Sequence, residues 1–195
     1  MKKTFLLSIF LMFFFNACFS IQALNPFSSE KKVFQKKLIK IPKDAPLWLI
    51  ERNIRNSISS IGISISKKQK QEKKEFIFFK QRAYINAGQN LTKNIYLKTL
   101  KLYSNYLNNV QSSMIFDKDI KEISEHIALQ SLNKASITNY WLNNNELYVQ
   151  IAVDSSIVAK LIQDNSKKLF NLDKELYKSF LSNRAKENII NILEE

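Results

Sequence analysis

Few residues of this 195-residue chain could carry out covalent or metal chemistry, because it contains one Cys and one His. A disulfide needs a second Cys, and a Cys/His zinc site needs several such ligands. His126 is the sole imidazole, and its position near Glu122 and Glu125 is typical of a solvated helix surface. The two glycines, Gly62 and Gly88, are too few for a Gly-rich phosphate loop. We therefore expect no catalysis, no cofactor and no metal site.

The Cys is placed where its thiol could receive a lipid. Two Lys residues precede an apolar run from Phe5 to Phe15, and Cys18 follows shortly after this run. This order is typical of a secretory signal peptide, and the run is short for a membrane span. The position of Cys18 resembles the lipobox of bacterial lipoproteins, in which the signal is cut before a diacylglycerol-modified Cys. We predict a lipoprotein signal peptide at 1–17 and a Cys18 that carries diacylglycerol and palmitate.

Two other outcomes of this N-terminus remain open. Phe15 stands three residues before the Cys, where a lipobox usually has Leu, and Asn16 is an unusual neighbour. Ordinary cleavage after Ser20 or Ala23 would remove Cys18 with the signal peptide. The apolar run could also stay uncleaved and act as an anchor helix.

The formal net charge of +13 is concentrated near the predicted lipid. Residues 19–45 contain six Lys against two acidic residues, and residues 67–82 contain seven basic against two acidic. Residues 83–195 are nearly balanced. Arg, which nucleic-acid-binding proteins favour, occurs only four times, so we expect no nucleic-acid partner. We interpret the basic part as facing an anionic membrane or wall. The candidate contacts are Lys67, Lys68, Lys70, Lys73 and Lys74.

The elements that would position these residues follow from hydrophobic periodicity. Residues 18–45 show no sustained period and are predicted to form a tether. A strand is predicted near 57–66, where Ile61, Ile63 and Ile65 alternate with small residues. Gly62 within it indicates a bulge or a close backbone approach.

One long amphipathic helix is predicted at about 68–112. Its apolar residues recur at spacings of three and four: Phe76, Phe79, Ala83, Ala87, Leu91 and Ile95. Two of these are Ala, and Gly88 lies beside them, so the middle of the helix is thin. A thin helix favours close packing across a sheet. Residues 117–131 predict a second, shorter helix.

A hairpin is predicted near 134–153, with a turn at three consecutive Asn residues, 143–145. In its first strand, Ile137, Asn139 and Trp141 are expected on one side. Tyr140 is expected on the other side together with Leu142. Across the hairpin, an aromatic pair of Trp141 with Tyr148 is expected. Asp154 would cap a helical region at 155–195.

This order of elements predicts an α+β fold. A small antiparallel sheet would be crossed by one long helix, with a C-terminal helical region in addition. The predicted division is a signal at 1–17, a lipidated and basic tether at 18–45, a domain at 46–154 and a helical extension at 155–195.

Several of these parts, in this order, resemble the twenty-kilodalton bacterial surface-lipoprotein (LPP-type) family, which includes flagellum-associated lipoproteins. The matching features are Cys18, the start at Pro46 and Trp48, the Gly-containing strand at Ile61 to Ile65, the A-x-x-x-A-x-x-x-L frame of Ala83, Ala87 and Leu91, and the hairpin from Tyr140 to Asp154. The resemblance covers roughly 46–154. It implies a sheet crossed by a long helix, an envelope location, frequent self-association and no catalytic residues.

The function we expect is that of a cell-envelope lipoprotein with a structural or protein-interaction role, anchored through Cys18. Phe19 stands where an Asp would favour retention in the inner membrane, so the outer membrane is favoured. The partner would be an envelope protein or a second copy. The alternative is a module that binds an anionic lipid or cell-wall polymer through the basic N-terminal part. A hydrolase is a third class, for which the chain offers few candidate residues.

Overall fold

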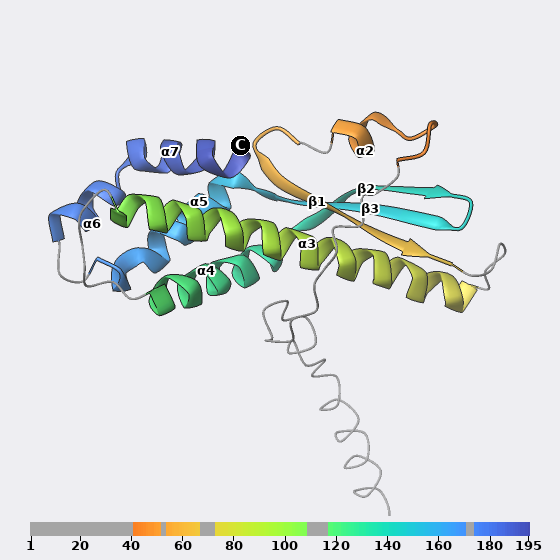
Figure 1. The fold of residues 1–195 in the computed structure, drawn as a ribbon. Coiled ribbons are helices and arrows are strands. Elements are labelled where there is room, and N and C mark those ends of the chain that lie inside the picture. Colours follow the sequence, from red (N-terminus) through yellow and green to blue (C-terminus); the bar gives the residue numbers. More distant parts are fainter. Residues whose placement is uncertain (1–40, 52–53, 67–72, 109–116, 171–173) are drawn as a thin grey trace, which may run out of the picture.

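The fold contains a three-stranded antiparallel sheet, which lies toward the right of the molecule in Figure 1, with the C-terminal helices toward the left. The computed structural model describes residues 41–51, 54–66, 73–108, 117–170 and 174–195. The strands are β1 (Ser57–Ile65), β2 (Ser136–Asn143) and β3 (Glu146–Asp154), in the order β1-β3-β2. The predicted α+β class is confirmed, with both predicted strand regions in one sheet.

Helices lie on both faces of this sheet. The long helix α3 (Lys73–Asn108) crosses one face over β1 and β3, with α4 (Asp117–Leu132) beside it (Figure 1). The short helix α2 (Leu47–Glu51) lies on the opposite face, where Leu49 packs with Ile61 and Tyr148. The ends of the predicted 68–112 helix lie outside the described residues.

The helix α3 touches β1 almost backbone to backbone. A Cβ atom on Gly62 would lie 2.1 Å from the carbonyl oxygen of Ala83 and 2.1 Å from the amide nitrogen of Ala87. The Asn86 side chain donates to the Ile63 carbonyl at 2.7 Å, and that of Asn90 donates to the Ile61 carbonyl at 2.8 Å. The close approach predicted from Gly62 and the thin helix is confirmed.

The alternation along β1 is also present, but the main core lies on the side with the smaller residues. Ile58 belongs to the core beneath α3, and Gly62 and Ser64 share its face of the strand. Ile61 and Ile63 instead pack on the other face, in the cluster around Leu49. Because α3 lies so close to β1 at Gly62, there is no room for a larger side chain at that position.

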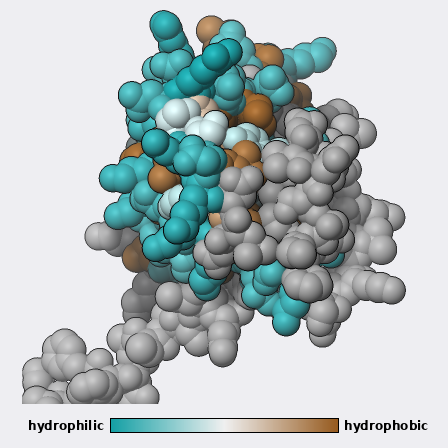
Figure 2. Space-filling model, turned by 90° about the vertical axis from the view of Figure 1, so that its left-hand side faces the viewer, coloured by the Kyte–Doolittle hydropathy of each residue, from teal (hydrophilic) through white to brown (hydrophobic). Residues whose placement is uncertain are grey.

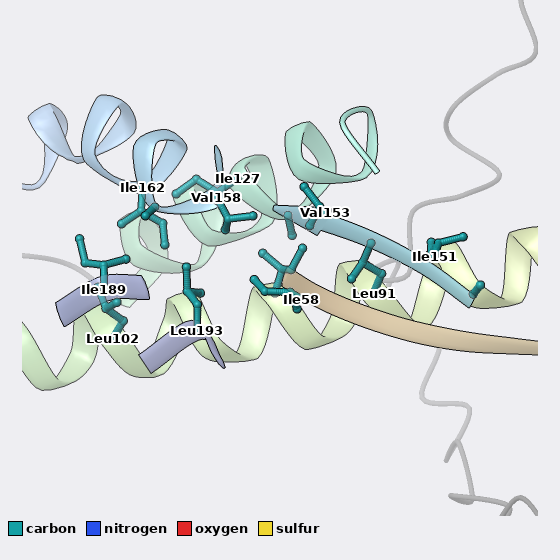
Figure 3. Close-up of a cluster of buried hydrophobic side chains, with 14 of the residues drawn as sticks. Ile58, Leu91, Leu102, Ile127, Ile151, Val153, Val158, Ile162, Ile189 and Leu193 are labelled. Carbon is teal, nitrogen blue, oxygen red and sulfur yellow. The ribbon is translucent and has the colours of Figure 1, made fainter. Parts of the chain in front are cut away.

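One hydrophobic core joins the sheet to the C-terminal helices. These are α5 (Ser155–Asn165), α6 (Lys174–Phe180) and α7 (Asn183–Glu194), with the short 3-10 helix η3 (Ser166–Lys168) after α5. Figure 3 shows Ile58 and Val153 of the sheet in the same cluster as Val158, Ile162 and Leu193. The region predicted as an extension therefore packs directly on the sheet.

The chain passes from β3 into α5 without a loop. Asp154 is the N-cap of α5, and its side chain accepts a hydrogen bond from the Ser156 amide at 2.7 Å. The Ser156 side chain, and after it the Ser156 amide, lower the pKa of the Asp154 carboxyl, since hydrogen bonds to the carboxylate favour its charged form. The predicted capping role of Asp154 is confirmed.

Candidate functional site

The described acidic residues and His126 do not converge on one place. In the described part of the chain, no group of three or more His, Cys, Asp or Glu side chains could hold a metal ion. His126 is exposed on α4, and the exposed Glu122 pairs with Lys118 at 3.7 Å. These side chains have the surface positions that the sequence favoured.

The predicted lipidation and anion-contact residues fall largely outside the described ranges. Cys18, Lys67, Lys68 and Lys70 lie outside them. Lys73 and Lys74 form the first turn of α3, and the positions of their side chains are not described. Among the described helices, none combines the length and apolar character that a membrane crossing requires. The roles predicted for these residues stay predictions.

The most unusual surface of the fold is on β2. Three of its apolar side chains are largely exposed: Ile137 (55%), Tyr140 (69%) and Leu142 (50%). They pair across the strands with Ile151, Val149 and Leu147, all of which belong to the main core. Directly paired residues of antiparallel strands point to the same face of the sheet. The three side chains therefore continue the core-facing side of the sheet beyond its helical cover, and we call them the open sheet face.

A β-bulge brings the three residues onto one face. The register of β2 against β3 shifts between Ile137 and Asn139, because Thr138 is the extra residue there. The predicted alternation, with Ile137 on the side of Asn139 and Trp141, is therefore wrong at this point. One extra residue in a strand reverses the face of the sheet to which the preceding residues point. Ile137 therefore lies on the same face as Tyr140 and Leu142.

The helix α3 borders the open sheet face. The Lys80 ammonium lies 5.6 Å from the ring centroid of Tyr140 and 5.1 Å from that of Phe76. Ile77 and Tyr84, three and four residues from Lys80, share its side of the helix and are exposed. An apolar surface that includes the Lys80 ammonium thus extends from β2 onto the flank of α3.

On the opposite face of the hairpin, the side chains contact one another. The rings of Trp141 and Tyr148 lie 5.3 Å apart, which confirms the predicted cross-strand pair. The Tyr148 hydroxyl donates to the Glu146 carboxylate at 2.6 Å. Burial of Tyr148, and then its bond to Glu146, raise the pKa of its hydroxyl above the usual value. Asn139 donates to the Gln150 side chain at 2.8 Å on the same face.

Sequence reasoning missed the open sheet face as a site. The hairpin was predicted, but its first strand looked like an ordinary half-buried strand. The available signal was the run of Ile137, Tyr140 and Leu142 beside β3, whose residues from Leu147 to Val153 are all buried. A sheet edge next to such a strand needs cover, and only the placement of α3 shows that the described helices leave these side chains exposed.

The end of the molecule that carries α6 and α7 has a different surface. The described residues of this end, which are the coloured ones in Figure 2, are mostly hydrophilic with apolar residues interspersed. In the described residues, the exposed apolar side chains there include Leu181, between α6 and α7.

No protein-family model matches the chain, and a search of curated proteins finds no significant match.

Proposed function

We propose that this protein is a lipid-anchored component of the bacterial cell envelope that acts by binding another protein through the open sheet face. The observation that carries the binding role is the row of Ile137, Tyr140 and Leu142. These side chains are half exposed or more, although their partners on β3 are buried. Contiguous exposed apolar residues on a folded protein typically mark an interaction site.

The entry of the chain into the domain supports this role. Ile41 and Ala45 pack against the cluster of Leu49, Ile61 and Tyr148, on the α2 side of the sheet. The open sheet face lies on the other side of the sheet. The described residues that lead into α2 therefore pack on the face of the sheet opposite the proposed binding surface.

Membership of the twenty-kilodalton surface-lipoprotein family and an outer-membrane location are part of the same proposal. They rest on the sequence features around Cys18 and on the order of the elements. The arrangement of a small sheet crossed by a long helix is the one that the resemblance implies.

A second candidate function is contact with an anionic lipid or cell-wall polymer through the basic N-terminal part. Its support is the charge of α3, which has no acidic residue from Phe76 to Asn108. Lys80, Arg82 and Lys93 are exposed along this stretch. They extend the basic segment 67–74 onto the described surface, where an anionic partner would be attracted.

The anchor is tested by metabolic labelling of growing cells with a palmitate analogue. We expect the wild-type chain to be labelled and recovered with outer membranes, because diacylglycerol on Cys18 holds it there. We expect Cys18→Ala to lose the label and the membrane association. A Ser20→Ala variant is the control and should behave as the wild type. Equal labelling of Cys18→Ala would contradict the proposed anchor.

The binding role is tested by native electrophoresis of envelopes solubilised in mild detergent. We expect the wild-type chain to migrate in a complex with another protein and the double variant Ile137→Ser, Leu142→Ser to leave it. The matched control, Leu97→Ser with Leu181→Ser, removes two exposed apolar residues from other surfaces and should keep the complex. A complex that survives the first double variant would overturn the proposed site.

A further inference from the structure

The open sheet face lies where the helical layer of the fold stops short. On the side of α3 that faces away from β1, α4 covers the helix as far as Gly88. There the position of a Cβ on Gly88 would be next to the side chain of Leu132, the last residue of α4. From there toward the N-terminus of α3, the same flank carries the exposed Tyr84 and Ile77. The uncovered flank and the uncovered strand β2 are neighbours, as the contact of Lys80 with Tyr140 shows.

The open sheet face and the exposed flank of α3 meet at an angle, and together we call them the step, with the sheet as its floor and the helix as its wall. The floor is the row of Ile137, Tyr140 and Leu142, and the wall is the flank of α3 around Lys80. Neighbouring helices pack with their axes about 8–10 Å apart, so one more helix would fit on β2 alongside α3. The wall from Ile77 to Tyr84 is about 10 Å long at 1.5 Å per residue, or about two turns.

Other kinds of occupant fit this step less well. A flat bilayer that touched the outer side of α3 would not reach the floor behind it. An added β-strand would pair with the outer edge of β2, but a bulge twists an edge and disfavours such pairing. The apolar side chains also point from the face of the sheet and not from its edge.

The positive charge of Lys80 indicates which kind of helix would bind in the step. Lys80 lies near the rings of both Phe76 and Tyr140, and no ion pair joins it to another described residue. Neither β2 nor the part of α3 from Phe76 onward contains an acidic residue. A carboxylate on the incoming helix would therefore meet an available cation. A second copy packed symmetrically would bring another Lys80 to the same place.

Building on the proposed function, we infer that the partner places an amphipathic helix in this step. Its apolar side covers Ile137, Tyr140 and Leu142, and an Asp or Glu on its border pairs with Lys80. The helix comes from a different protein. Its apolar residues are three and four positions apart, as in other helix-in-groove complexes.

The test is photo-crosslinking of the full chain in the bacterium that produces it. The probe is p-benzoyl-phenylalanine in place of Leu142, and in place of Leu181 as the control position. We expect cross-linking at 142 to one protein, with the linked peptide showing helical apolar spacing and at least one acidic residue. We expect no such product at 181.

Charge variants then test the pairing with Lys80. Lys80→Glu should lower the cross-linking yield at 142 at least tenfold, and Lys80→Met should lower it by less. Lys93→Glu, an exposed Lys further along α3, should leave the yield within twofold. Circular dichroism of each variant shows whether it is folded.

Each other result overturns the inference. Cross-links to lipid, to a second copy or to a strand-forming or basic segment would exclude an acidic helix as occupant. An unchanged yield with folded Lys80→Glu would exclude the charge pair, and no product at 142 would exclude the site. If the native complex is lost in the double variant Ile137→Ser, Leu142→Ser but the linked peptide is not an acidic helix, the binding role stands and only this inference fails.

Discussion

Gly62→Ala is expected to abolish folding of the protein under conditions in which the wild type is stable. The added Cβ would lie 2.1 Å from two backbone atoms of α3, in Ala83 and Ala87, and 2.8 Å from the Ala87 Cα. Backbone atoms cannot rotate away, so α3 would have to move off the sheet along its contact with β1. We expect a loss of more than about 4 kcal/mol in the free energy of unfolding, a large part of the total stability of a domain.

The effect would be steric and not conformational, because Gly62 does not have a positive φ. Gly88→Ala is the matched control within the same region. Its Cβ would approach only the side-chain methyl carbons of Leu132, at 3.3 and 3.8 Å. These methyl groups can shift, and Ala is favoured over Gly inside a helix by about 1 kcal/mol.

Urea unfolding followed by far-UV circular dichroism measures both variants. Gly88→Ala should match or slightly exceed the wild-type midpoint, while Gly62→Ala should lack a cooperative transition. A Gly62→Ala protein with a wild-type midpoint would show that α3 and β1 are not in this close contact.

Phe180→Ala is expected to destabilise the sheet, although Phe180 lies at the end of α6. Its ring is almost fully buried, with centroids 4.9 Å from Tyr106 and 5.0 Å from Phe170. Phe180 also lies 6.2 Å from Tyr103 of α3, whose hydroxyl donates to the Ile162 carbonyl of α5 at 2.9 Å. Burial raises the pKa of the Tyr103 hydroxyl, so it stays protonated as a donor. Truncation of such a Phe costs about 3–5 kcal/mol.

The two Trp residues of the chain make this prediction specific. Trp48 and Trp141 both pack in the cluster around Tyr148, on the far side of the sheet from α6. If the C-terminal helices and the sheet unfold together, Phe180→Ala should lower the midpoint of the Trp fluorescence transition in urea. Leu181→Ala, at the exposed neighbouring residue, is the control. Its free energy of unfolding should stay within about 0.5 kcal/mol of the wild-type value.

An unchanged Trp transition in Phe180→Ala would mean that residues 155–195 form a separate unit, as the predicted boundary at 154 implied. The shared core argues for the first result. Val158, Ile162 and Leu193 belong to the same cluster as Ile58 and Leu91.

Much of the fold was predictable because its signals are local. The period of two in β1 and the period of three to four in α3 depend only on nearby residues. The Asn turn, the Trp141–Tyr148 pair and the Asp154 cap are equally local, and all three occur as predicted. Gly62 indicated a bulge or a close backbone approach, and the thin middle of α3 indicated close packing on a sheet; the structure shows that these two features meet.

The bulge at Thr138 was not predictable in the same way. It adds one residue to β2, and the sequence of one strand does not show how its partner is aligned. The consequence is large, since it moves Ile137 to the side of Tyr140 and Leu142. The proposed binding surface depends on that shift.

By itself, the sequence determined which segments become helices and strands and placed a lone thiol and a basic segment near the N-terminus. Only the tertiary structure decided which face of each strand is covered. Burial depends on where distant segments pack, and α3 lies over β1 and β3 because Gly62 lets it approach there. Among the described elements, that position leaves the core-facing residues of β2 without a helix over them, which no local pattern around Ile137, Tyr140 or Leu142 could show.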